Sequence, residues 1–228
     1  MFLNNATEQG VNTNFAFKSH RFKVISEESE NIYLNETELI QIDKLDLTDK
    51  PKLDNVRDLF LIGCYTGLRF SDLSHLTNDD IKGDFIHIRQ QKTGNPVLIP
   101  LHPVVKKIWQ KHGNKPPRNI SNQRFNEYIK EVCRLAGIDS PEHKAITKGG
   151  IKQSVKYKKY ELVTSHTARR SFATNLYKSG FPSTSIMQIT GHRTERAFLK
   201  YIKVTPEEHA KMLQLHWANT GQYLSVAK

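Results

Sequence analysis

The alternation of apolar and polar positions predicts a mainly helical chain with two short β segments. A helix is expected to begin near Asn35–Glu36, where the asparagine can cap it and ETELIQIDKL repeats its apolar residues at helical spacing. The segment NVRDLFLIGCYTGL is apolar on nearly all sides over Leu59–Tyr65, which indicates a buried central helix. Gly67 can end that helix, and SDLSHL starts another with Ser71 as N-cap and Asp72 in its first turn.

The pattern then changes from helical spacing to alternation. DFIHIRQQ alternates, KTGN is typical of a turn and PVLIPL alternates again, which predicts a β-hairpin. KAITKGGIKQSVKYKKYELVTS predicts a second, strongly basic hairpin that turns at Gly149–Gly150. The remaining segments are predicted helices: Pro103–Lys111, Ser121–Ala136, His166–Ser179, Ser183–Thr190, Glu195–Ile202 and a last helix that Thr205, Pro206 and Glu208 start as a capping box. The predicted fold class is α+β, mainly α, with small β-hairpins.

The charge balance indicates which class of partner the chain binds. The chain has 34 Lys+Arg against 23 Asp+Glu, a formal charge of +11, which favours a polyanionic partner. We expect nucleic acid rather than a membrane, because no apolar stretch approaches the roughly 20 residues that span a bilayer. Cys64 and Cys133 lie in apolar or helical patterns and are expected to be ordinary thiols of a reducing cytoplasm. The histidines lack metal-ligand spacing, so we expect no metal.

The helix in HTARRSFATN begins with unusual residues. Arg169 lies one turn before Ala173, on the edge of the apolar stripe, whereas Arg170 is expected to point towards the solvated side. His166 lies three residues before Arg169, so their side chains can meet. Burying an arginine destabilises the fold unless an anion or a carboxylate pairs with its guanidinium group.

Other candidate residues lie at helix starts and turns. Arg69 follows the buried helix, Lys92 lies at the tip of the first hairpin, His192 follows a glycine, and Tyr201 ends HRTERAFLKY. Together with His166 and Arg169, this set suits a phosphodiester, because the fork of arginine binds two non-bridging oxygens at once. Each residue alone also has a structural explanation: Arg69 as a helix cap, Lys92 as a solvated turn residue, Tyr201 as a core aromatic.

In this order and spacing, the residues resemble the active site of tyrosine recombinases, the phage-integrase family, and most closely integrases of bacterial mobile elements such as conjugative transposons. The resemblance runs from about Asn31 onward. Its boxes are TGLRFSDL with Arg69, QQKTGN with Lys92, HTARRSFAT with His166 and Arg169, and GHRTERAFLKY with His192 and Tyr201.

The resemblance also implies the domain organisation. Residues 31–228 would be the catalytic domain of a tyrosine recombinase, and the polar, weakly periodic residues 1–30 the residual end of a core-binding domain plus an interdomain linker. In the family, the core-binding domain closes a clamp around DNA. We therefore expect weak DNA binding and poor recombination by this chain alone.

The family mechanism assigns the nucleophile to Tyr201. It would attack the scissile DNA phosphate, form a 3′-phosphotyrosyl bond and release a 5′-hydroxyl. Arg69, Arg169 and His192 would stabilise the charge that grows on the phosphate oxygens. Lys92 would protonate the leaving 5′-oxygen.

The remaining family roles are supporting ones. His166 would assist proton transfer, and Asp72 would support the arginine and the histidine. Neither metal, ATP nor another cofactor is implied.

The implied partner is double-stranded DNA, bound in a bacterial, nucleoid-associated cytoplasmic setting. The family favours a homo-tetramer on synapsed DNA through the last helix, with Met212, Leu213 and Trp217; packing on their own domain, and a monomer in isolation, stay open. Further basic residues are candidate DNA contacts or a solvated face: Lys148, Lys152, Lys156, Lys158, Lys159 and Arg170. Alternative functions are a non-catalytic DNA-binding relative, a type IB topoisomerase-like enzyme, and a phosphohydrolase with His166 as nucleophile.

Overall fold

The computed structural model describes residues 2–19, 32–148, 151–202 and 204–224. Contacts divide the chain into two compact units, Met1–Glu30 and Asn31–Lys228. The first unit holds the helix α1 (Phe2–Glu8) and a 3-10 turn at Ala16–Lys18, neither of which buries a residue. All of the candidate residues for chemistry lie in the second unit.

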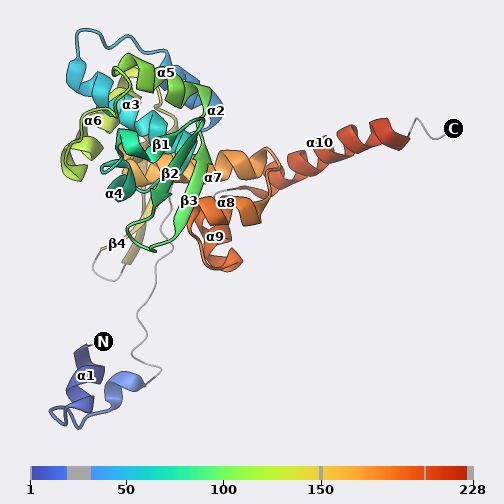
Figure 1. The fold of residues 1–228 in the computed structure, drawn as a ribbon. Helices are drawn as coiled ribbons and strands as arrows, with labels where there is room; N and C mark the ends of the chain where they lie inside the picture. Colours follow the sequence, from blue (N-terminus) through green and yellow to red (C-terminus); the bar gives the residue numbers. More distant parts are fainter. Residues whose placement is uncertain (1, 20–31, 149–150, 203, 225–228) are drawn as a thin grey trace. The chain divides into compact units, whose positions relative to one another are not determined.

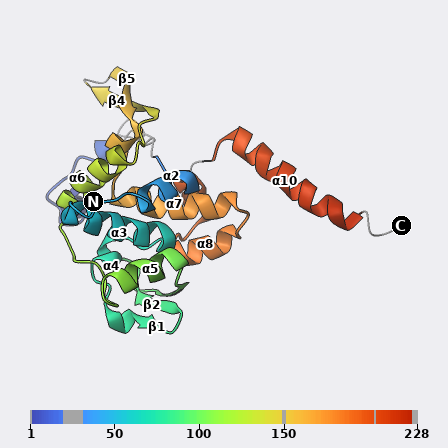
Figure 2. The ribbon, with the colours of Figure 1, turned by 90° about the horizontal axis from the view of Figure 1, so that it is seen from above.

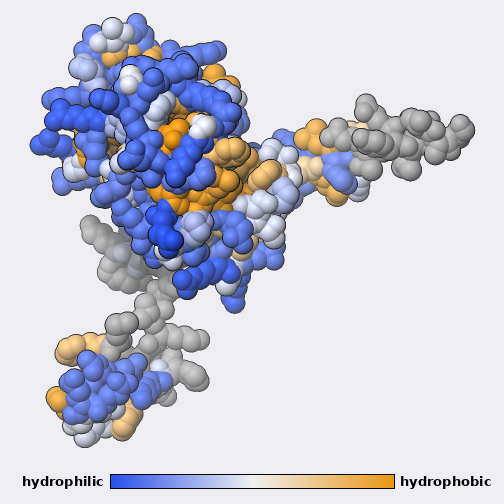
Figure 3. Space-filling view, viewed as in Figure 1, coloured by the Kyte–Doolittle hydropathy of each residue, from blue (hydrophilic) through white to orange (hydrophobic). Residues whose placement is uncertain are grey.

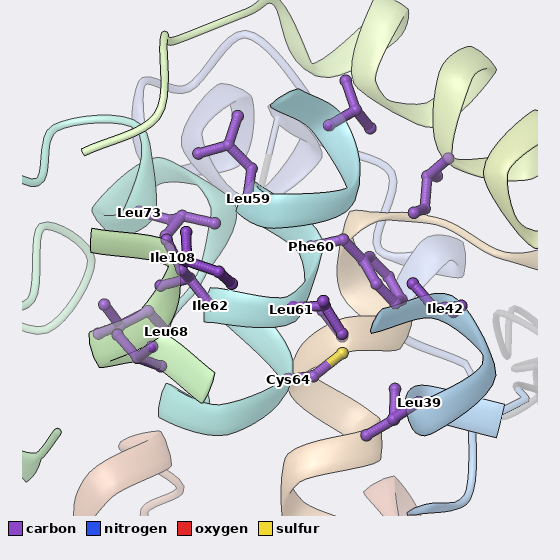
Figure 4. Close-up of a cluster of buried hydrophobic side chains, with 14 of the residues drawn as sticks. Leu39, Ile42, Leu59, Phe60, Leu61, Ile62, Cys64, Leu68, Leu73 and Ile108 are labelled. Carbon is purple, nitrogen blue, oxygen red and sulfur yellow. The ribbon is translucent and has the colours of Figure 1, made fainter. Parts of the chain in front are cut away.

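A buried helix, α3 (Pro51–Thr66), forms the centre of the second unit, as the sequence predicts. Phe60, Leu61 and Cys64 point towards α2, whereas Ile62 points towards Ile108 of α5 (Figure 4). The helix is therefore covered on opposite sides. The helices that pack against it include α2 (Glu36–Asp43), α5 (Pro103–Lys111), α6 (Asn122–Leu135) and α7 (Ser165–Lys178).

Two glycines end helices that lead into the site. Gly67 adopts a left-handed conformation, with φ of 67°, and ends α3 as expected. A Cβ at Gly67 would lie 2.4 Å from the Phe172 ring, so the position also permits close packing on α7. The helix after it, α4 (Phe70–Leu73), starts directly after Arg69, whose extended backbone serves as N-cap. The predicted N-cap at Ser71 is therefore wrong: the helix begins two residues earlier and includes the buried Leu73.

The first hairpin forms as predicted and belongs to a three-stranded antiparallel sheet. Its strands are β1 (Ile81–Lys82), which the sequence pattern did not indicate, β2 (Phe85–Arg89) and β3 (Pro96–Pro100). Ile86 pairs with Ile99 and both are buried, whereas Phe85 and Leu98 are exposed on the other face. Figure 3 shows apolar surface in this region of the molecule. The turn between β2 and β3 carries Lys92.

The second predicted hairpin is β4 (Pro141–Lys148) and β5 (Ile151–Lys158), and its turn at Gly149–Gly150 lies outside the described residues. The basic stretch that follows is a 3-10 turn, Lys159–Leu162, rather than strand. Lys159 is therefore not on an exposed basic face. It is buried, and its Nζ contacts both carboxylate oxygens of Glu38 at 2.6 and 2.8 Å. Its assignment as a DNA contact stays a prediction.

A second, smaller core joins α7 to α8 (Ser183–Thr190) and α9 (Glu195–Tyr201) through Phe172, Ile186 and Phe198. The last helix, α10 (Pro206–Leu224), is tied to α7 only near its start. The predicted capping box is present, since the Glu208 N–H donates to Thr205 Oγ1 and the Thr205 N–H to Glu208 Oε2.

Beyond this start, α10 extends away from the other helices of its unit (Figures 1 and 2). Leu213, Leu215 and Trp217 are exposed, Trp217 to 64%. Leu213 and Trp217 thus do not pack on their own domain. Within the described ranges, none of the helices has the length and apolar character needed to cross a bilayer.

Candidate active site

The predicted site residues line one cleft of about 520 Å³. They come from segments far apart in the sequence: the α3–α4 junction, the β2–β3 turn, the start of α7, the α8–α9 loop and the end of α9. The lining is Arg69, Lys92, Thr93, His166, Arg169, Gly191, His192, Arg193 and Tyr201. No acidic side chain belongs to this lining among the described residues, so the cleft favours a negatively charged ligand.

The two arginines are held by backbone carbonyls and an amide. Arg169 is buried, and its Nη1 donates to the carbonyl oxygen of Gly67 at 2.6 Å. Arg69 donates through Nη1 to Gln90 Oε1 at 2.9 Å, and its Nη2 lies 3.4 Å from the Thr190 carbonyl oxygen. Burial and then the nearby Arg69 charge lower the pKa of Arg169 to about 10. The site thus holds two cations close together, which an anion would stabilise.

This arrangement decides between the two interpretations of Arg69. The carbonyl that Arg69 faces belongs to the end of α8, not of α3, so Arg69 does not cap the helix that precedes it. Arg169 faces inward, as the apolar stripe of its helix predicts. The cost of that orientation is offset only in part by the Gly67 carbonyl oxygen.

Tyr201 lies against both histidines. Its ring centroid is 5.4 Å from that of His166 and 4.7 Å from that of His192. Its hydroxyl is buried and has no hydrogen-bond partner among the described residues. Burial raises the pKa of Tyr201, and the charges of Arg169 and Arg170 oppose that rise. The phenol is therefore protonated at neutral pH, next to cations that would stabilise its anion.

Arg170 does not point towards solvent, which corrects its predicted orientation, whereas its assignment as a DNA contact stays a prediction. It is buried at 5% exposure, its Nε donates to the backbone oxygen of Tyr201 at 3.0 Å, and its guanidinium lies 4.7 Å from the centroid of the Tyr201 ring. The periodicity of α7 alone marks this side as polar. The end of α9 covers it, a contact that only the tertiary fold supplies. Arg170 thus holds Tyr201 by its main chain and by its ring.

Both histidines are neutral at pH 7 in the free protein. Burial and the Arg170 charge, followed by other cations, lower the pKa of His166 to about 4, although its side chain is open to solvent at the cleft mouth. Burial and Arg169 lower the pKa of His192 to about 4. The Thr190 hydroxyl donates to the Ile186 carbonyl oxygen and lies 2.8 Å from His192 Nδ1. Nδ1 must then be the protonated nitrogen that donates to Thr190, which leaves Nε2 as an acceptor.

Asp72 supports the turn that carries Lys92. Its buried carboxylate accepts a hydrogen bond from the backbone N–H of Gln91 at 2.9 Å. Its charge also raises the pKa of Arg169 against the larger effect of burial. Asp72 therefore acts on the arginine through charge and on the turn through a hydrogen bond, while Lys92 itself is exposed.

Sequence reasoning missed Gln90 and Arg193. Arg193 is exposed and follows His192 in the loop after α8. Gln90 is fully buried and accepts from Arg69. A signal for Gln90 was present: it continues the inward positions of Ile86 and Ile88 in the alternating strand, so it is a polar residue at a core position.

Comparison with known proteins decides the family. The profile of the phage integrase family matches residues 33–208. The chain belongs to the phage integrase family. No curated protein matches the chain by sequence.

Solved structures of tyrosine recombinases share the fold of this family member. A lambda integrase(75–356) dimer bound to a COC′ core site has a TM-score of 0.63 at 16% identity, with 88% of this chain and 68% of that chain covered. XerA recombinase has a TM-score of 0.60 at 18% identity, with 81% and 65% covered. XerH bound to a palindromic difH substrate has a TM-score of 0.59 at 17% identity, with 83% and 54% covered. This phage integrase family member thus spans about half to two thirds of these recombinases.

None of the described side chains of the basic hairpin of this integrase-family chain belongs to the cleft lining. Lys156 and Lys158 are exposed on β5, whereas the side chains of Lys148 and Lys152 lie outside the described residues. In the part of the chain that the structure describes, no group of His, Cys, Asp and Glu residues is placed to hold a metal ion.

Proposed function

We propose that this chain is the catalytic part of a site-specific DNA recombinase. Tyr201 attacks a DNA phosphodiester and forms a 3′-phosphotyrosyl intermediate, from which strands are exchanged without metal or ATP. The observation that carries the proposal is the Tyr201 hydroxyl, which is buried next to Arg169 and makes no hydrogen bond of good geometry with the described residues. Arg69, His166 and His192 line the same cleft. Family membership and the fold support the same reaction class.

The cleavage step balances as a transesterification. A bond forms between Tyr201 Oη and phosphorus, and the bond from phosphorus to O5′ breaks. The phenolic proton passes to His166, which is neutral and can accept it. The Lys92 ammonium supplies a proton to the departing O5′. Rejoining runs the same step in reverse with a 5′-hydroxyl as nucleophile.

Arrival of the phosphate changes the charges in the cleft. Arg69 and Arg169 would bind the non-bridging oxygens, and the added negative charge would raise the pKa of His192 and allow it to donate from Nε2. The same negative charge relieves the repulsion between the arginines. The repulsion between the two arginines in the free protein is thereby removed when DNA binds. The stabilisation is strongest in the transition state, where negative charge builds up on the phosphate.

The partners follow from the same proposal. The substrate is double-stranded DNA, and the exposed apolar residues of α10 would dock on a neighbouring subunit in a homo-tetramer on synapsed DNA. The resemblance to integrases of conjugative transposons supports a role in moving a bacterial mobile element at the nucleoid. Residues 1–30 would be the end of a core-binding domain and its linker.

The experiment uses a pool of duplexes with randomised sequence, each nicked so that the short 5′-hydroxyl fragment diffuses away after cleavage. Adducts that survive denaturation are isolated and their DNA is sequenced, which yields both the activity and the preferred site. Tyr201→Phe should abolish the adduct. Tyr177→Phe is the matched control, because Tyr177 is a half-buried tyrosine of the same small core and lies outside the cleft lining.

Several outcomes oppose the proposal. No adduct with the wild-type chain or with a longer version that carries a core-binding domain, or an adduct that persists in Tyr201→Phe, would overturn covalent catalysis by Tyr201. Relaxation of supercoiled DNA without any strand transfer between duplexes would replace recombination by the type IB topoisomerase-like alternative. Binding of DNA with no cleavage at any site would favour the non-catalytic relative.

A further inference from the structure

Gln90 is a fully buried residue whose amide oxygen and amide nitrogen are both hydrogen-bonded. Its Oε1 accepts from Arg69 Nη1 and from Thr93 Oγ1, both at 2.9 Å. Its Nε2 donates to the carbonyl oxygen of Ile189 at 2.8 Å. A buried polar group is tolerated only when its hydrogen bonds are satisfied, and here the partners come from three separate segments.

Each of those segments carries one of the proposed catalytic residues. Arg69 belongs to the α3–α4 junction, Thr93 is next to Lys92 in the β2–β3 turn, and Ile189 lies near the end of α8, just before His192. The fit is close, since a Cβ at Gly191 would lie 2.5 Å from Gln90 Oε1. The amide therefore joins the elements that bring the cations to the cleft.

The turn around Lys92 is held on both sides. Gln90 bonds Thr93 after Lys92, and Asp72 bonds the backbone N–H of Gln91 before it. The Lys92 side chain itself is exposed. Its reach towards a leaving oxygen is therefore set by the backbone of the turn, and that backbone is fixed against the segment of Arg69.

We infer that Gln90 is a positioning residue that fixes the place of Arg69 relative to the Lys92 turn. Arg69, which binds the phosphate, and Lys92, which donates the proton, then act on the same phosphodiester. This inference rests on the proposed function. It predicts that loss of Gln90 impairs protonation of the leaving group, an effect that general loosening of the fold would not single out.

The test compares two leaving groups. The duplex selected from the randomised pool is prepared with oxygen or with sulfur at the 5′-bridging position. A thiol has a pKa of about 8.5, far below that of an alcohol, so a thiolate leaves without a proton donor. Gln90→Met keeps the length of the side chain and removes its hydrogen bonds. Gln110→Ala, an exposed glutamine of α5, is the control.

Because general acids commonly contribute a factor of about 10² or more, Gln90→Met should slow single-turnover cleavage of the oxygen substrate at least about tenfold. The fold loss of cleavage rate that Gln90→Met causes on the sulfur substrate should be at least about fivefold smaller than its loss on the oxygen substrate. Equal losses on both substrates, or no loss on either, would overturn the inference. Failure of both the wild-type chain and a longer version that carries a core-binding domain to form an adduct with either substrate would instead overturn the proposed function.

If circular dichroism shows that Gln90→Met does not fold, Thr93→Val takes its place in the test. It removes only the hydroxyl that donates to Gln90 from the turn. A smaller loss confined to the oxygen substrate is expected. A loss of the same size on both substrates would contradict the inference.

Discussion

At the scale of single residues, positive charge is concentrated around one phenol. Arg69, Arg169 and Lys92 line the cleft with Tyr201, and Arg170 lies against its ring. The three arginines donate to carbonyl oxygens and to the Gln90 amide, and among the described residues none of them forms an ion pair with a carboxylate. Arg170 therefore positions Tyr201 without needing a contact of its own with DNA.

Arg170→Met tests that distinction. It removes the hydrogen bond to the Tyr201 backbone and the charge over its ring, so single-turnover cleavage at saturating DNA should fall about tenfold or more, since misplacing a reacting group is costly. DNA affinity, measured by fluorescence anisotropy, should stay within about twofold of wild type. Arg134→Met, at an exposed arginine paired with Glu131, is the control. Weakened binding with an unchanged cleavage rate would make Arg170 a DNA contact after all.

The lowered pKa values of His166 and His192 link stability to pH. Both groups bind fewer protons when folded than when unfolded, so the free domain should lose stability as pH falls from 6.5 through about 4. His166→Gln and His192→Gln should each flatten that loss in thermal unfolding scans. His87→Gln, at an exposed histidine of β2, should not. Identical pH profiles for all variants would show that the two imidazoles are not penalised by the cations.

At the scale of elements, the periodic segments were predictable, whereas β1 was missed and the start of α4 was misplaced. α5 and α8 have the predicted bounds, because each carries about two turns of regular spacing. β1 and α4 are too short to show a period, and they form because neighbouring strands and core leucines hold them.

The same limit applies to the candidate site. The residues of the family boxes could be found by their order, whereas the contacts of Gln90 and Arg170 join segments far apart in the chain. The alternation of β2 places Gln90 at an inward position, but the sequence pattern does not indicate its hydrogen-bond partners or the cover that α9 gives to Arg170.

The basic hairpin β4–β5 gives a prediction at this scale. If Lys156 and Lys158 contact phosphates, replacing both by glutamine should weaken DNA binding and reduce the slope of log affinity against log salt by about 0.9 for each contact. Titrations at several salt concentrations measure that slope. The control is the pair Lys106 and Lys107, which are engaged with Asp84 and Asp43. A slope equal to that of wild type would leave the hairpin as a solvated face.

At the scale of the whole molecule, the exposed apolar residues of α10 are better suited to contact another subunit than to stabilise their own domain. Its start is fixed by Lys178 and Glu208, at 2.6 Å, while Leu213 and Trp217 are exposed beyond it. Large exposed apolar residues on one helix are typical of an interaction surface.

Replacing Leu213 and Trp217 by serine should therefore leave the melting temperature within about 2 °C of wild type, as for other surface changes. Assembly on DNA, measured by light scattering, should be lost. The paired change Leu59→Ser and Phe60→Ser in α3 provides the opposite reference, since both residues are in the core. A large fall in melting temperature for the α10 variant would show that α10 packs on its own domain.

The central claim is that Tyr201 becomes covalently joined to DNA, and peptide mapping tests it most directly. The adduct from the nicked duplexes is digested with protease and nuclease, and the nucleotide-bearing peptide is sequenced by mass spectrometry. The nucleotide should be attached to Tyr201 through its 3′-phosphate. Attachment to His166 or to any other residue, or DNA cut with no peptide attached, would contradict the account.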